Sequence, residues 1–118
     1  MPQSGVDVDE VSERVRRRVR KDFPHQAEQV IEALAGLTEG VFSGEPRDSI
    51  AVERIQVAAL VRAHGRLRKL DEAVALGRRD WRDLLVGAGL AHEGWQQLVE
   101  NELAPPPSGH AWLARRRR

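Results

Sequence analysis

Cysteine and tyrosine are absent from this 118-residue chain, and aromatic residues are scarce, with three tryptophans and two phenylalanines. Without cysteine the chain has no disulfide, no thiolate metal site and no cysteine nucleophile. The scarcity of aromatic rings means that the core has to be built mainly from Ala, Val, Leu and Ile. Each tryptophan therefore carries information about where the chain packs or binds.

Long apolar runs are also missing. No run approaches the roughly 18–20 residues that a helix needs to cross a bilayer. The first ten residues, MPQSGVDVDE, are polar and acidic, unlike a secretory signal peptide. We therefore expect a cytoplasmic protein without membrane contact.

The common catalytic and metal-binding motifs are not found either. No serine lies in a G-x-S-x-G elbow, and no pair of histidines has the H-E-x-x-H spacing that places two ligands on one helical face. The four histidines lie in different segments, at His25, His64, His92 and His110. We expect no enzyme, no cofactor and no metal site.

The residues that are present suit one globular domain. Hydrophobic residues make up 41% and charged residues 31% of the chain, enough to form a core and to remain solvated. The net charge is only +1, but its distribution is uneven. Six of the eight residues from 14 to 21 are basic, and the chain ends in four arginines.

The first helix is indicated by apolar residues that recur every four positions, at Val11, Val15, Val19 and Phe23. This spacing predicts an amphipathic helix from about residue 9. Pro24 disfavours the helical conformation of the residue before it, so we expect a break near residues 22 and 23.

Five further helices are predicted from periodicity and from capping residues. The second should end soon after Gly36, and Gly77 should close the fourth. The third has apolar residues on more than one face and should be the most buried. The second helix is predicted over about 24–37, and the third from a cap at residue 48 or 49 to 64–65. The fourth is predicted over 67–76, the fifth from a cap at Asp80 to 87–89, and the sixth over 93–103.

These elements predict an all-α fold, a compact five- or six-helix bundle of helical hairpins with a flexible C-terminal tail. No segment alternates like a strand. A short solenoid of repeated helix pairs is the alternative, but no internal period supports it. We expect a disordered N-terminus over 1–8, a single helical domain over 9–104 and a flexible Pro/Arg tail over 105–118.

The segment Arg79-Asp80-Trp81-Arg82-Asp83-Leu84-Leu85 resembles a group of small uncharacterised bacterial helical proteins. The resemblance extends loosely back to residues 53–56 and forward to Trp95. It implies a shared helical core and carries no activity with it.

The same segment has two interpretations that need no family. Asp80 can cap a helix that locks two hairpins together, with Trp81 packed across the preceding turn. Alternatively, Trp81 and the arginines beside it form an exposed anchor, since Trp and Arg dominate interface hot spots. In the second case the chain is a non-catalytic protein-interaction or regulatory module that binds an unknown protein or a second copy of itself. The candidate partner-binding residues are Arg79, Trp81, Arg82 and Trp95.

Nucleic-acid binding is the alternative function. Clustered arginines can neutralise phosphates, and a tryptophan beside them can stack on a base. The candidate residues are Arg14, Arg16, Arg17, Arg18, Arg20 and Lys21 in the first helix, and Trp112, Arg115, Arg116, Arg117 and Arg118 in the tail. The tail could instead fold back onto the acidic residues of the sixth helix, Glu93, Glu100 and Glu102.

Overall fold

The structure, a computed structural model, describes residues 11–42 and 49–104. These residues form six helices and no strand. Their bounds are α1 Glu13–Asp22, α2 Ala27–Phe42, α3 Ser49–Ala63, α4 Leu67–Arg79, α5 Trp81–Ala88 and α6 Trp95–Leu103. The all-α compact bundle is thus confirmed, with six helices. The expected N-terminal disorder and the Pro/Arg tail lie outside the described residues.

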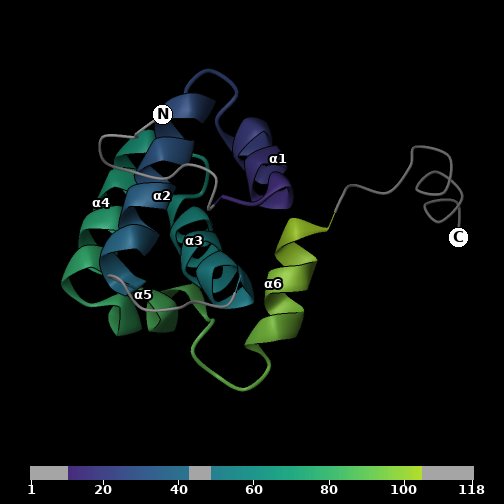
Figure 1. Ribbon diagram of the computed structural model, residues 1–118, viewed down its shortest axis with the longest axis vertical. Coiled ribbons are helices and arrows are strands. Elements are labelled where there is room, and N and C mark those ends of the chain that lie inside the picture. The colour runs from purple at the N-terminus through teal and green to yellow at the C-terminus, as the bar shows by residue number, and fades with distance from the viewer. Residues whose placement is uncertain (1–10, 43–48, 105–118) are drawn as a thin grey trace, which may run out of the picture.

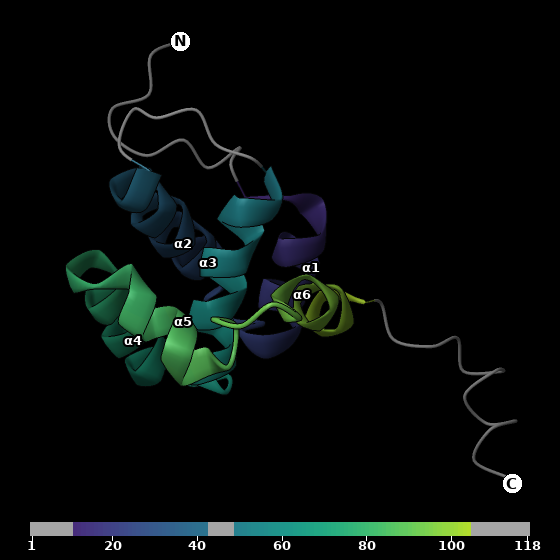
Figure 2. The same ribbon diagram turned by 90° about the horizontal axis from the view of Figure 1, so that it is seen from below.

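Helix α3 is the centre of the bundle and contacts each of the other five helices. Helices α2, α4 and α5 pack on one side of it, and α1 and α6 on the other (Figure 1). The view from below shows the same arrangement, with α6 beside α1 (Figure 2). Nearly all of the α3 side chains between Val52 and Leu60 are buried. This central position agrees with the expectation that the third helix is the most buried.

Helix α1 shows how local sequence fixes local structure. The Ser12 side chain caps the helix by accepting a hydrogen bond from the backbone N–H of Val15. The predicted stripe is buried, with Val15 and Val19 fully inside and Phe23 1% exposed. Residues 24–26 then form a turn, so α2 begins at Ala27, three residues later than predicted.

Helix α2 continues beyond the predicted end at residue 37, through Gly36 and Gly40 to Phe42. Leu37 and Thr38 are both buried, and the Thr38 hydroxyl donates to the carbonyls of the preceding turn. Tertiary burial therefore outweighs the low helix propensity of the two glycines.

Gly77 does not close α4, as the sequence suggested, but lies inside it and is buried. A Cβ atom at this position would lie 2.8 Å from Leu37 Cδ1 and 2.9 Å from Leu84 Cδ2. The glycine is therefore a close-contact point where α4 meets α2 and α5.

Two expected helix ends are confirmed. His64 and Gly65 both have positive φ, +50° and +73°, after the last residue of α3. Gly89, with φ +77°, ends α5 in the left-handed conformation that favours glycine. Gly87, by contrast, is inside α5 rather than at its end. Helix α6 starts at Trp95, two residues later than predicted, and the backbone N–H of Gly94 before it donates to Nδ1 of His92 at 3.1 Å.

Candidate functional site

The corner between α4 and α5 exposes the candidate partner-binding residues that the sequence placed around Asp80. The Asp80 side chain accepts a hydrogen bond from the backbone N–H of Arg82 at 3.2 Å and so caps α5 as predicted. Trp81, the first residue of α5, has 37% of its surface exposed, and Arg79 and Arg82 are also exposed. We call Arg79, Trp81 and Arg82 the α4–α5 corner.

The Trp81 ring is partly covered by its own neighbour. The Arg82 guanidinium carbon lies 5.2 Å from the ring centroid, a cation–π distance. Leu84 and Leu85, one turn further on, are buried and fix α5 to the bundle. Trp81 is therefore a large apolar side chain at the surface of a firmly packed helix.

Trp95 is not part of the α4–α5 corner. It is half-buried at the start of α6 and packs against the core. The guanidinium of Arg54 lies 4.3 Å from its ring centroid and donates two hydrogen bonds, of 3.0 and 2.8 Å, to the carbonyl of Leu90. Trp95 and Arg54 together tie α6 and the segment before it to α3.

The arginines of α1, candidates for nucleic-acid binding, divide into paired and exposed residues. Arg14 donates to Glu53 of α3 and to Glu100 of α6, at distances of 2.7–2.8 Å. Arg18 donates to Asp22 and to both the side chain and the backbone carbonyl of Glu102. These two arginines hold α1 against α3 and α6.

The remaining basic residues of α1 are less engaged with other helices. Arg17 and Lys21 are exposed, one turn apart on the helix. Arg20 is also exposed and has a long ion pair, 3.4 Å, with Glu13 of the same helix. Arg16 donates to the backbone carbonyl of Val11 at 3.0 Å. The other nucleic-acid candidates, Trp112 and Arg115–Arg118, lie outside the described residues.

Two of the three acidic residues expected to receive the tail are already paired. Glu100 and Glu102 accept hydrogen bonds from Arg14 and Arg18, whereas Glu93 is exposed at the start of the α6 region. The tail itself lies outside the described residues, so its fold-back stays a prediction.

Glu53 is a buried carboxylate that sequence reasoning missed. Its side chain is 8% exposed and accepts three hydrogen bonds, two from Arg14 and one of 2.6 Å from the Ser12 hydroxyl. The hydrogen bonds from Arg14 hold the pKa of Glu53 below its usual value near 4.5, against the opposing effect of burial. The available signal was that Glu53 is the one acidic residue of the mainly apolar helix α3, since a buried charge requires a partner.

Gln56 is a second buried polar side chain of α3 that the sequence did not single out. Its Nε2 donates to the hydroxyl of Thr38 on α2 at 3.2 Å. Its Oε1 has no hydrogen-bond partner among the described residues. Gln56 and Thr38 are both buried, and their hydrogen bond joins α3 to α2.

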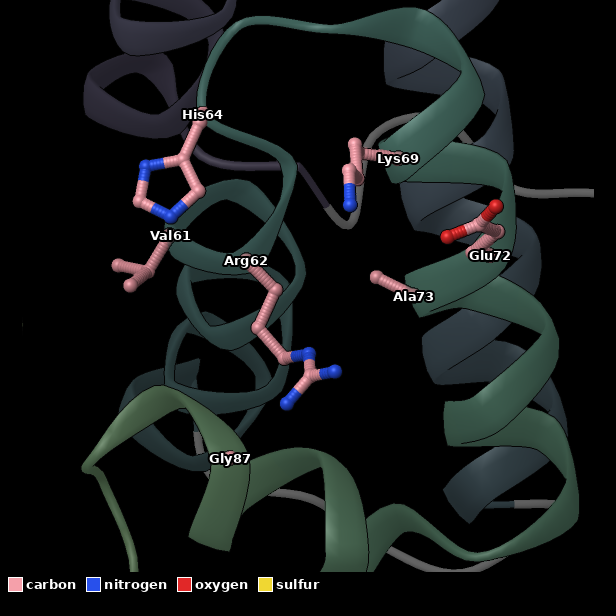
Figure 3. A pocket seen from close by; sticks show the side chains of 7 residues that line it. All are labelled: Val61, Arg62, His64, Lys69, Glu72, Ala73 and Gly87. Atoms are coloured by element: carbon pink, nitrogen blue, oxygen red, sulfur yellow. The ribbon is translucent and has the colours of Figure 1, made fainter.

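A small pocket opens at the surface where α3, α4 and α5 meet, with a volume of about 280 Å³. Arg62 and His64 line it from α3 and the turn that follows, Lys69 and Glu72 from α4, and Gly87 from α5 (Figure 3). We call this the basic pocket. A neighbouring hollow of about 410 Å³ shares Val61 and His64 with it and extends toward Arg18 and Glu102.

Other kinds of site find no support in the described parts of the chain. Residues 11–42 and 49–104 contain no group of three or more acidic or histidine side chains placed to hold a metal ion. None of the helices in these ranges has the length and apolarity that a bilayer crossing requires.

No protein family, curated protein or solved structure matches the chain.

Proposed function

We propose that the chain is a non-catalytic protein-interaction or regulatory module that binds its partner through the α4–α5 corner. The observation that carries this proposal is the exposure of Trp81. Among the described residues, Trp81 and Val86 are the large hydrophobic side chains classed as exposed, and both belong to α5.

The setting of Trp81 suits a binding anchor. Its helix is fixed by the Asp80 cap and by the burial of Leu84 and Leu85, so the ring is presented without the entropy cost of ordering a loop. Arg79 and Arg82 lie beside it, and this combination of residue types is enriched at interface hot spots.

The test is site-specific crosslinking in cells that express the chain. A photoreactive amino acid at position 81 should capture a defined partner or a second copy, whereas the same group at exposed position 17 of α1 should not. The captured partner should then bind the purified wild-type chain and lose affinity by tenfold or more, about the effect of a hot-spot residue, for Trp81→Ala. Unchanged affinity of Trp81→Ala would refute the proposal.

Nucleic-acid binding is the second candidate, favoured by the exposed Arg17 and Lys21. The ion pairs of Arg14 and Arg18 leave fewer free cations on α1 than the sequence suggests. A salt titration against random RNA and DNA tests it, because phosphate contacts give a steep decline of log K with log salt. Arg17→Gln/Lys21→Gln should reduce that slope by about 2, and deletion of 108–118 should abolish binding.

A further inference from the structure

The basic pocket is lined by cationic side chains from two helices, Arg62 of α3 and Lys69 of α4. Arg62 reaches down from α3 toward α5, and Lys69 points from α4 into the space between α3 and α4 (Figure 3). Neither residue has an ion pair or hydrogen bond within the described ranges, in contrast to Arg14 and Arg18 of α1. Their charges are available to a ligand.

Arg62 packs against the backbone of α5 at Gly87. A Cβ atom built at Gly87 would overlap Nη1 of Arg62, so the guanidinium occupies the place where a side chain on α5 would begin. Glycine weakens the interior of a helix, and α5 is only eight residues long. In this structure the absence of a side chain at Gly87 lets the guanidinium lie close to the helix backbone.

The sequence from the end of α3 to the start of α4 is strongly basic. The eight residues from 62 to 69 contain Arg62, Arg66, Arg68 and Lys69 and no acidic residue. Glu72 is the one carboxylate that lines the pocket among the described residues. His64 stands at the rim with a φ of +50°, a conformation that a non-glycine residue adopts at some cost in strain. The left-handed pair His64-Gly65 turns the chain so that the end of α3 and the start of α4 flank the same hollow.

We propose that the basic pocket binds the phosphate group of a small phosphorylated molecule. A guanidinium fork and an ammonium group together match a tetrahedral oxyanion that carries two negative charges. The volume of about 280 Å³ lies just below the usual range of ligand pockets, roughly 300–1,000 Å³, and so suits a small ligand. Glu72 opposes any anion, but the two cations outweigh it. Because the net attraction grows with the charge of the ligand, a doubly charged monoester is favoured over a singly charged diester or carboxylate.

This site goes beyond the proposed partner-binding function and does not depend on it. The test is an NMR titration of the full chain at constant ionic strength with four probes: inorganic phosphate, methyl phosphate, dimethyl phosphate and acetate. Methyl phosphate should produce saturable amide shifts confined to residues 61–73 and 87. Saturation by methyl phosphate but not by inorganic phosphate assigns the site to a phosphate ester, and saturation by both assigns it to the phosphate group itself.

Charge variants test the named residues directly. Lys69→Gln and Arg62→Gln should each weaken methyl phosphate binding about tenfold, the effect of losing one charge-assisted hydrogen bond. Glu72→Gln should strengthen it, because it removes the opposing charge. Arg17→Gln on exposed α1 is the matched control and should leave the affinity unchanged.

Three outcomes would overturn the proposal. Shifts that do not saturate, or that spread equally to residues 14–21, mean that the anion sees only general positive charge. Equal affinity for dimethyl phosphate means that the pocket recognises a nucleic-acid backbone instead. Equal affinity of Glu72→Gln and the wild type means that the anion does not enter this pocket.

Discussion

Arg14 of α1 and Glu53 of α3 face each other with a two-point contact, Nε to Oε2 at 2.8 Å and Nη2 to Oε1 at 2.7 Å. The same guanidinium donates to both carboxylate oxygens of Glu100 on α6. One side chain thus connects the first, third and sixth helices. In the sequence, the basic stretch of the first helix suggests phosphate binding. In the structure, its Arg14 instead stabilises the packing of three helices.

Removing Arg14 should destabilise the fold. Arg14→Met keeps the apolar stem but leaves the buried Glu53 carboxylate with Ser12 as its remaining donor. We expect a loss of about 2 kcal/mol in the free energy of unfolding, as for a hydrogen bond to a charged group whose partner stays buried. Urea unfolding followed by circular dichroism measures it.

The control for this change is Arg17→Met, on the exposed face of the same helix, which should alter stability by less than about 0.5 kcal/mol. Arg14→Met/Glu53→Gln should lose less than the sum of the two single variants, because the charge left without its partner is then gone as well. Equal effects of Arg14→Met and Arg17→Met would contradict this account.

The stability should also depend on pH through Glu53. Its pKa is lowered in the folded state, so its contribution is complete above the unfolded value of about 4.3 and is lost as the pH falls through the folded value. The difference in unfolding free energy between wild type and Glu53→Gln should be constant above about pH 5 and should shrink below it. Urea unfolding at a series of pH values measures this difference.

The matched control is Glu32→Gln, an exposed carboxylate of α2 without a hydrogen bond or ion pair in the described ranges. The variant should follow the wild type across the whole pH series. A wild-type advantage over Glu53→Gln that persists unchanged to about pH 3 would show that the charge on Glu53 does not stabilise the fold.

The sequence predicted the fold class and the starts of α3, α4 and α5 because those depend on local signals, whereas α1, α2 and α6 begin two to four residues later than predicted. The four-residue spacing of Val11, Val15 and Val19 and the capping residue Asp80 were sufficient for that. The predicted ends of α2 and α4 were wrong, because burial of Leu37 and Thr38 keeps α2 helical past Gly36, and Gly77 lies in a close contact between helices. Glycine signals a helix end only when tertiary burial does not override it.

The candidate site was predictable in part. Exposure of Arg79, Trp81 and Arg82 follows from their position where α4 ends and α5 begins, and the sequence brought them together because they are neighbours. The different setting of Trp95 was not predictable, because its cover, Arg54, comes from another helix. The basic pocket was missed for the same reason, since Arg62, Lys69 and Gly87 lie on three helices and meet only in the folded chain.

Two glycines should respond in opposite ways to the same substitution. A Cβ at Gly40, inside α2, would meet open space, so Gly40→Ala should stabilise the protein by about 0.5–1 kcal/mol through helix propensity. A Cβ at Gly77 would press on buried Leu37 and Leu84, and overpacking of this kind costs about 1–3 kcal/mol. Gly77→Ala should therefore be less stable than Gly40→Ala by at least about 1 kcal/mol in thermal unfolding. Equal stability of the two variants would mean that the α2–α4–α5 contact is looser than described.

Arg54 should be required to hold α6 in place. Burial lowers its pKa, and no carboxylate pairs with it in the described parts of the chain, so its charge is stabilised by the Leu90 carbonyl and by the face of Trp95. Arg54→Ala should lose about 1–3 kcal/mol of stability, because it removes a charged donor and leaves the carbonyl without those bonds.

The fluorescence of Trp95 tests the same contact. In a Trp81→Phe/Trp112→Phe background, where Trp95 is the single indole, Arg54→Ala should move its emission to longer wavelength because the ring loses its cover. Arg54→Lys should recover little, since an ammonium group cannot reproduce the guanidinium fork. Arg68→Ala, at an exposed arginine of α4, is the matched control and should leave both stability and emission unchanged. Emission that stays the same in Arg54→Ala would show that another group covers Trp95 and that α6 is held without this arginine.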